Sequence, residues 1–215
     1  MKILIVPAIA AILAFSVNGC KSSSSTSPKL LCDTACLKDT LKFTGDHTTK
    51  PFAYITPSNC KGDTLVWGYT GIATRKTKFD YPDAKLNKDF TRCLFKDNEF
   101  AYILFNDCAT GRGFQIKLPY DKKQSFVMKT SGINNIDPKF FIADNLVVNT
   151  DRGNIYLEDI ATGKKAMMTF GEKLDIDYDA LHEYIDSVNI TNSRIWVKVK
   201  IGGNWKELEK KITLE

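Results

Sequence analysis

Three segments in the second half of the chain share one pattern, and this repetition restricts the fold more than any other feature. Each reads as a strand, a tight turn, a longer strand, a glycine-containing turn and a third strand, with β-branched and aromatic residues in the strands. The segments are residues 91–119, 145–170 and 187–214, with middle strands that begin at Phe100, Asn154 and Arg194. Strands joined in this way form antiparallel meanders, so the sequence predicts a mainly β fold of repeated three-stranded antiparallel meanders.

Two of the glycine-containing turns have nearly the same sequence, DCATG at 107–111 and DIATG at 159–163. The aspartate accepts hydrogen bonds within such a turn, and the glycine supplies positive φ at its end. The pattern Asp-x-Ala-Thr-Gly-Lys/Arg resembles the blade turns of quinoprotein-like and related β-propellers. The resemblance implies a propeller-like array. A β-sandwich is the alternative, because the middle strands are unequally spaced, at 54 and 40 residues, and only three clear units are present.

The first 29 residues indicate an exported, lipid-anchored protein. Lys2 precedes an apolar run at 3–17, which has the length of a signal-peptide core and is short for a membrane span. The run leads into VNGC at 17–20, which resembles the lipobox of bacterial lipoproteins and implies cleavage after residue 19 and acylation of Cys20. We therefore predict a signal peptide at 1–19, a flexible serine-rich tether at 20–29 and a single β-rich domain at 30–215.

The residue after Cys20 bears on where the protein is anchored. Lipoproteins kept in the inner membrane often carry Asp at this position, and this chain carries Lys21, so the resemblance implies the outer membrane of a bacterial cell envelope. An ordinary secreted protein cut at another small residue, or a retained membrane anchor, is the alternative interpretation. The predicted mature chain has a side-chain charge of 29 − 25 = +4 with basic and acidic residues intermixed, so nucleic acid is not an expected partner.

Five cysteines remain in the predicted mature chain, namely Cys32, Cys36, Cys60, Cys93 and Cys108. An exported compartment permits disulfides, and an odd number leaves at least one thiol without a partner in the chain. The favoured disulfide joins Cys60 to Cys32 or Cys36. A zinc site at this Cys-x3-Cys pair is the alternative.

One cysteine pair is argued against by strand geometry. The segment 91–108 reads as a hairpin that turns at Asp97-Asn98, which would place Cys93 opposite Tyr102. Cys108 would then lie six residues further along the strand, about 20 Å away. That distance is too long for a disulfide between Cys93 and Cys108.

One or two short helices are expected beside the strands. One covers residues 32–43, with Asp33 as its N-cap and Gly45 after its end. The other covers 177–188, where Leu181, Tyr184, Ile185 and Val188 recur at helical spacing. Strands are predicted at 52–56 and 64–70, and a long loop or weak helix at 71–89.

Alternating acids at the start of the second helix raise the hypothesis of a calcium site. Positions 1, 3, 5, 9 and 12 of an EF-hand-like loop would be Asp175, Asp177, Asp179, Glu183 and Asp186. Ala180 stands where that loop needs glycine, and position 12 is Asp where Glu normally chelates. The simpler interpretation is an acidic helix N-terminus favoured by the helix dipole. No other cofactor is indicated.

No catalytic pattern is present in the sequence. Neither His47 nor His182 lies in a catalytic motif, because HEYID at 182–186 lacks the second histidine of a zinc-protease helix. We therefore expect a lipid-anchored binding or assembly module of the cell envelope, without catalytic activity. The alternatives are an inhibitory or immunity-type lipoprotein and an envelope glycan hydrolase whose two carboxylates converge only in the fold.

The candidate ligand contact is Trp205, which follows Gly202, Gly203 and Asn204 at a predicted turn. An exposed aromatic ring in such a place can stack on a sugar or anchor a protein, whereas simple packing is the alternative. The expected partners are the membrane, through the lipid anchor, and an envelope protein or glycan.

Overall fold

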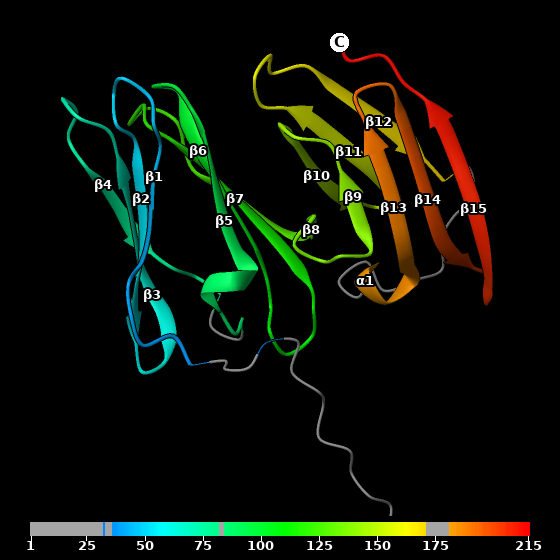
Figure 1. The fold of residues 1–215 in the computed structure, drawn as a ribbon, viewed down its shortest axis with the longest axis horizontal. Coiled ribbons are helices and arrows are strands. Elements are labelled where there is room, and N and C mark those ends of the chain that lie inside the picture. Colours follow the sequence, from blue (N-terminus) through cyan, green and yellow to red (C-terminus); the bar gives the residue numbers. More distant parts are fainter. Residues whose placement is uncertain (1–31, 33–35, 82–83, 171–180) are drawn as a thin grey trace, which may run out of the picture.

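The computed structural model describes residues 32, 36–81, 84–170 and 181–215 (Figure 1). These residues form fifteen strands in three open sheets, with one 3-10 turn at Lys88–Phe90 and one helical turn, α1, at Leu181–Tyr184. The prediction of a mainly β fold is confirmed. The predicted signal peptide, Cys20 and the serine-rich tether lie outside the described residues.

The first sheet contains four antiparallel strands in chain order, β1 (Leu41–Thr44), β2 (Phe52–Ser58), β3 (Lys61–Gly68) and β4 (Arg75–Lys78). The helix predicted at 32–43 is wrong in its described part, because residues 36–40 are not helical and β1 follows them. Leu41 is buried and pairs with Ile55, so these apolar residues belong to a strand. The segment 71–89, predicted as a loop or helix, contains β4.

The second sheet has seven strands in the order β12-β11-β10-β8-β7-β6-β5, and it carries two of the three predicted meanders. The first meander consists of β5 (Thr91–Lys96), β6 (Phe100–Asn106) and β7 (Gly113–Pro119). The second consists of β10 (Leu146–Asp151), β11 (Asn154–Asp159) and β12 (Lys165–Thr169). Because β8 (Val127–Ile133) pairs with both β7 and β10, the two meanders form one continuous sheet.

The third sheet contains the remaining meander and one parallel strand. Its order is β15-β14-β13-β9, made of β9 (Phe140–Ile142), β13 (Ile185–Thr191), β14 (Arg194–Ile201) and β15 (Asn204–Lys211). The helix predicted at 177–188 is reduced to α1 in its described part. Ile185 and Val188 are both buried in β13, and a bulge lies between Ile185 and Ser187. The extra residue of a bulge puts positions three apart on one face of a strand, which imitates helical spacing.

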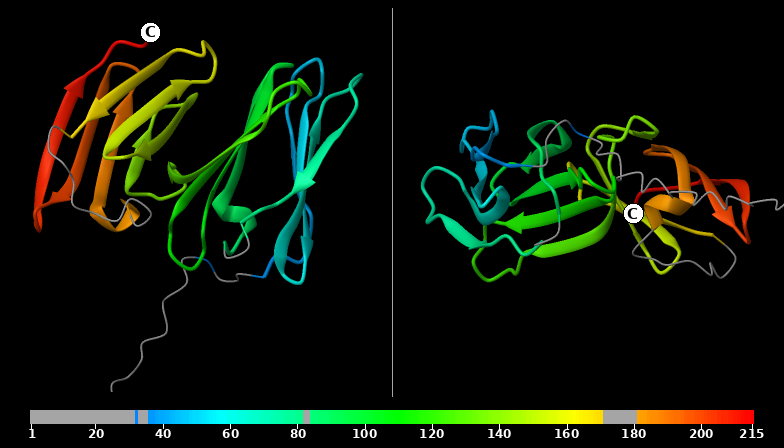
Figure 2. Two further views of the ribbon diagram at one scale, coloured as in Figure 1. Left: turned by 180° about the vertical axis from the view of Figure 1, so that it is seen from behind. Right: turned by 90° about the horizontal axis from the view of Figure 1, so that it is seen from below.

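The three sheets pack as two sandwiches that share the seven-stranded sheet (Figures 1 and 2). The first sheet packs on β5–β7 through a core that includes Ile55, Trp67, Ile103 and Phe105. The third sheet packs in the same way on β10–β12. Separate propeller blades closing into a ring do not occur in the described chain, because the first two meanders are hydrogen-bonded through β8. The sandwich alternative describes this packing.

The seven-stranded sheet bends at β8, so its two arms face each other. Only two residue pairs join β8 to β10, and a bulge interrupts the pairing of β8 with β7. At the bulge Gly113 faces Gly132 so closely that a Cβ on Gly113 would overlap the Gly132 carbonyl oxygen. Asn134 supports the bend, since its Nδ2 donates to the Phe105 carbonyl at 3.1 Å and the Phe114 carbonyl at 3.2 Å.

Both Asp-x-Ala-Thr-Gly turns form as predicted. The Gly111 N–H donates to the Asp107 carbonyl at 2.8 Å, and the Gly163 N–H donates to the Asp159 carbonyl at 2.7 Å. Both glycines have positive φ, 78° and 73°. The Asp107 carboxylate also accepts from the Lys85 N–H at 2.6 Å, so this turn is tied to the segment before β5.

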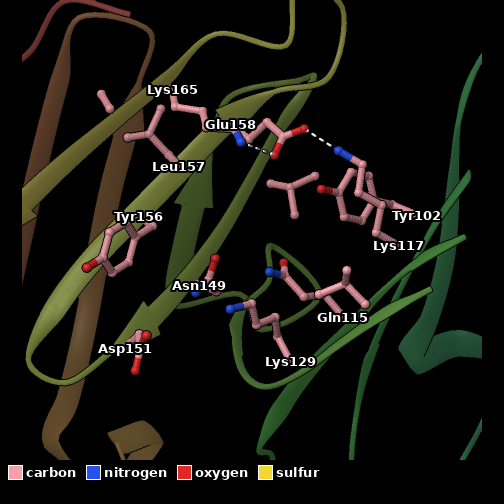
Figure 3. Close-up of a pocket in the computed structure, with 13 residues that line it drawn as sticks. Tyr102, Gln115, Lys117, Lys129, Asn149, Asp151, Tyr156, Leu157, Glu158 and Lys165 are labelled. Atoms are coloured by element: carbon pink, nitrogen blue, oxygen red, sulfur yellow. Dashed lines mark hydrogen bonds and ion pairs between the residues drawn. The ribbon is translucent and has the colours of Figure 1, made fainter. Parts of the chain in front are cut away.

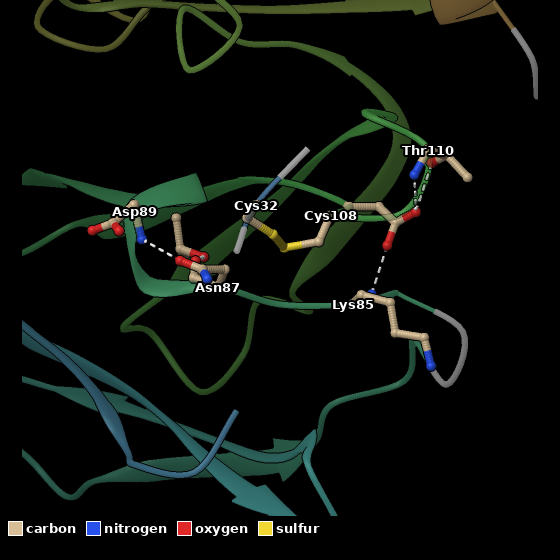
Figure 4. The surroundings of a disulfide bond; sticks show 8 residues. Cys32, Lys85, Asn87, Asp89, Cys108 and Thr110 are labelled. Atoms are coloured by element: carbon tan, nitrogen blue, oxygen red, sulfur yellow. Dashed lines mark hydrogen bonds between the residues drawn. A yellow bond between two sulfur atoms is a disulfide. The ribbon is translucent and has the colours of Figure 1, made fainter. Parts of the chain in front are cut away.

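Two disulfides are present, Cys36–Cys60 with a Cα–Cα distance of 4.4 Å and Cys32–Cys108 with a Cα–Cα distance of 5.4 Å (Figure 4). The favoured pairing of Cys60 with one of the first two cysteines is confirmed, and so is the exclusion of Cys93–Cys108. The two thiols of the alternative zinc site are both in disulfides. Cys93 is a free cysteine.

The predicted register of the β5–β6 hairpin is wrong by one residue. Cys93 pairs with Ile103, and Lys96 pairs with Phe100. The loop therefore has three residues, 97–99, closed by a 2.9 Å hydrogen bond from the Glu99 N–H to the Lys96 carbonyl. Asp97 adopts positive φ in this loop, a conformation that the short side chain of an aspartate tolerates.

Candidate functional site

A cleft of about 520 Å³ lies between the two arms of the bent sheet (Figure 3). Strands β6, β7 and β8 form one wall, and β10, β11 and β12 form the other. Alternation along each strand places one set of side chains in the cleft and the next set in a sandwich core. The lining residues are Tyr102, Gln115, Lys117, Val127, Lys129, Val147, Asn149, Asp151, Tyr156, Leu157, Glu158, Lys165 and Ala166.

An ion pair closes one end of the cleft. Lys117 Nζ lies 2.7 Å from Glu158 Oε1, and Lys165 Nζ lies 3.7 Å from Glu158 Oε2. The Lys117 ammonium also lies 4.1 Å from the centre of the Phe100 ring, a cation–π contact. Burial raises the pKa of Tyr102, and the neighbouring Glu158 charge and hydrogen bond raise it further. The charged and polar groups at this end are therefore already paired with one another.

The middle of the cleft holds polar groups with unused hydrogen-bonding capacity. Gln115 is 5% exposed, and its Oε1 is buried without a hydrogen-bond partner. Lys129 pairs with Gln115 in the strand register, and its ammonium makes no ion pair with any residue that the structure describes. Asn149 Nδ2 makes one long contact, 3.5 Å to the Thr150 carbonyl. Figure 3 shows these three side chains directed toward the middle of the cleft.

The far wall of the cleft carries one aromatic ring, that of Tyr156. Tyr156 on β11 pairs with Asn149 on β10, so its half-buried ring stands beside the Asn149 amide. The Tyr156 hydroxyl accepts a hydrogen bond from Asn154 Nδ2 at 3.3 Å. Asp151, at the end of this wall, lies 3.8 Å from Arg152 Nε. The cleft thus combines an aromatic face, two amides and one ammonium, which suits binding of a small polar molecule.

Trp205, the candidate ligand contact, lies outside this cleft. It is 47% exposed on β15, where it pairs with Lys200, and its ring centre is 5.9 Å from Lys198 Nζ. The exposure expected from its place after a glycine turn is present. Its role as a ligand contact stays a prediction.

The calcium hypothesis falls largely on residues that the structure does not describe. Asp175, Asp177 and Asp179 lie outside the described residues. Asp186 Oδ2 lies 3.2 Å from Lys198 Nζ, and the hydrogen bond from Lys198 lowers the pKa of Asp186. No group of three or more His, Cys, Asp or Glu side chains that could hold a metal occurs within the described ranges. Glu183 is exposed.

Sequence reasoning missed the cleft because its residues are far apart in the chain. Gln115 and Lys117 alternate with apolar residues in β7, a strand in which every residue except Lys117 is buried. Polar side chains inside such a strand are the one sequence feature that indicates a polar site on this face of the sheet. The partner of Lys117 is Glu158, 41 positions later in the chain and on the opposite wall of the cleft, so local sequence patterns do not connect the two.

Comparison of the chain with protein-family models, with curated proteins and with solved structures finds no match. No helix within the described residues is both long enough and apolar enough to span a membrane.

Proposed function

We propose that the chain is a lipid-anchored binding module of the bacterial cell envelope that holds its ligand in the cleft and catalyses no reaction. The observation that carries this proposal is the buried, unpartnered Oε1 of Gln115 in a cleft of about 520 Å³. Buried polar atoms are nearly always hydrogen-bonded, so an unpaired one in a cavity favours a ligand that supplies the missing partner.

The proposed anchor is Cys20 in the outer membrane. Its support is the order of features in the sequence, with a charged start, an apolar run, VNGC and a serine-rich tether. The disulfide Cys32–Cys108 agrees with an oxidising compartment. Cys32 follows Cys20 by 12 residues, so the tether would meet the first sandwich at this bond.

The cleft favours binding over glycan hydrolysis. Its two carboxylates are Asp151 and Glu158. Glu158 pairs with Val147, and Asp151 lies four residues further along β10, which is about 14 Å along the strand. The two catalytic carboxyls of glycosidases lie only about 5–9.5 Å apart. Glu158 is also held by two lysines, which favours a structural role for it.

Photo-crosslinking in cells tests the binding surface. In one variant a photoreactive phenylalanine analogue would replace Val127, which is 46% exposed at the cleft. In the control variant it would replace Phe141, which is 57% exposed on β9, outside the cleft. We expect envelope material to be captured at position 127 and not at position 141. Capture only at a third probe position, Trp205, would overturn the cleft proposal and support the inhibitory lipoprotein, whose partner is a protein.

Metabolic labelling tests the anchor separately. Cells fed a palmitate analogue should label the wild-type chain and leave a Cys20→Ser variant unlabelled. The labelled chain should fractionate with the outer membrane. An unlabelled wild-type chain found in the medium would show instead that it is an ordinary secreted protein.

A further inference from the structure

The groups in the middle of the cleft define what a ligand must supply. Gln115 Oε1 is a carbonyl oxygen and accepts hydrogen bonds only. It is buried without a partner, and leaving such an atom unpaired costs about 1–3 kcal/mol. A ligand that reaches it must therefore bring a donor, which a hydroxyl or an N–H provides.

The charges in the cleft add a second requirement. Three lysines and two acids line it, which gives 3 − 2 = +1. Glu158 takes both Lys117 and Lys165 as partners, and Asp151 lies beside Arg152. Lys129 is the cleft cation left without a carboxylate among the described residues. One ammonium matches one negative charge on a ligand.

The remaining lining residues indicate the shape of the ligand. Asn149 pairs with Tyr156 on β11, and in Figure 3 its side chain lies between the Tyr156 ring and the side chains of Gln115 and Lys129. A ring with polar edges and apolar faces fits such a place, with its edges on the amides and one face on the tyrosine. The volume of about 520 Å³ lies within the range of small-molecule sites.

We infer that the cleft binds an acidic saccharide, a unit of one or two sugar rings that carries a carboxylate. The carboxylate pairs with Lys129, a ring hydroxyl donates to Gln115 Oε1, and a ring face packs on Tyr156. The inference rests on the proposed function, since it names the ligand class for the same cleft. A doubly charged phosphate is less suited, because the described cleft offers it one unpaired ammonium and no guanidinium fork.

Calorimetric titration of the mature wild-type chain tests the inference without any mutation. The probes are galacturonate and its methyl ester, which keeps the ring and the hydroxyls and loses the charge, with N-acetylmuramic acid as a second acid. We expect the acids to bind at least tenfold more tightly than the ester. Equal affinities for acid and ester, or binding of neither acid, would overturn the inference.

Two variants then assign the contacts. Lys129→Gln should weaken galacturonate binding at least tenfold and leave ester binding unchanged, whereas Gln115→Leu should weaken both. Lys123→Gln is the matched control, because Lys123 is exposed on the loop before β8, outside the cleft. Thermal unfolding of each variant shows whether it remains folded. Unchanged acid binding by a folded Lys129→Gln variant would also overturn the inference.

The outcomes separate this inference from the proposed function. If no saccharide binds while position 127 still captures a protein in cells, the ligand class is wrong and the binding module stands. If neither saccharide binding nor capture at position 127 is found, both are wrong. If the acids bind through Lys129, both are supported.

Discussion

Lys117 Nζ and Glu158 Oε1 lie 2.7 Å apart although their strands are not neighbours. Between β7 and β11 the sheet contains β8 and β10. In a flat sheet these two strands would be about 14 Å apart, so the ion pair exists only because the sheet bends. The pair therefore links the two arms of the bent sheet across the cleft.

Glu158→Gln should destabilise the protein, because it leaves the Lys117 ammonium, 28% exposed, without its charged partner. We expect the free energy of unfolding to fall by about 1–3 kcal/mol. Glu209→Gln is the control, since Glu209 forms a more exposed 3.8 Å pair with Arg194 and should change stability by at most ~1 kcal/mol. Urea unfolding measures both. Equal losses of unfolding free energy in the two variants would mean that the Lys117–Glu158 pair contributes no more to stability than an exposed ion pair.

Gly113→Ala should disrupt the bend. The new Cβ would meet the backbone oxygen of Gly132, and backbone cannot move aside without breaking the pairing of β7 with β8. We expect a loss of at least ~2 kcal/mol. Gly68→Ala is the matched strand control, because its Cβ would meet the end of the Phe52 ring at 3.1 Å, which can shift. A Gly113→Ala variant as stable in urea as Gly68→Ala would contradict this account of the bend.

The two similar turns should differ in their contributions to stability. The Asp107 carboxylate accepts from Thr110 N and Oγ1 and from the distant Lys85 N–H. Among the residues that the structure describes, the donors to Asp159 Oδ1 are Ala161 and Thr162, within its own turn. Asp107→Ala should cost about 2–4 kcal/mol and Asp159→Ala about 1–2 kcal/mol. Chemical denaturation of both variants checks the order, and a reversed order would refute it.

Cys93 should be unreactive in the folded protein. Burial raises the pKa of its thiol, and the thiolate is the reactive form. In a mature chain carrying Cys20→Ser, a thiol reagent should label none of the cysteines under native, non-reducing conditions. It should label one after unfolding without reductant and five after reduction, because four of the five are in disulfides. Mass spectrometry counts the labels, and rapid native labelling would show that Cys93 is accessible.

The protein should lose stability in alkali. Burial raises the pKa values of Tyr81, Tyr102 and Tyr120 above the ordinary 10.0. The unfolded chain releases these protons near pH 10, whereas the folded chain retains them. The stability that depends on these protonated tyrosines is therefore fully present below about pH 10 and is lost as the pH rises above it. Urea unfolding at about pH 8 and about pH 11 measures the loss. Tyr102→Phe should make the loss of stability between the two pH values smaller. An unchanged loss would contradict the contribution assigned to Tyr102.

The sequence by itself determined the local β structure. Alternating apolar residues and the turn residues at 107–111 and 159–163 act over a few neighbouring positions, so the three meanders could be read directly. The disulfide of Cys60 with one of the first two cysteines was also predictable. Local patterns failed where a bulge in β13 imitated a helix, and where Asp97 adopted positive φ and lengthened a hairpin loop by one residue.

Only the tertiary structure decided how the meanders join and where the cleft lies. The edges of a meander present the same backbone groups, so periodicity does not choose which edge pairs with which. Here β8 pairs with both meanders, and the close approach of Gly113 and Gly132 accompanies the bend of the resulting sheet. That bend brings Lys117 to Glu158 and forms the cleft around Gln115. Side chains on one face of a sheet come together across it only when the sheet curves toward that face.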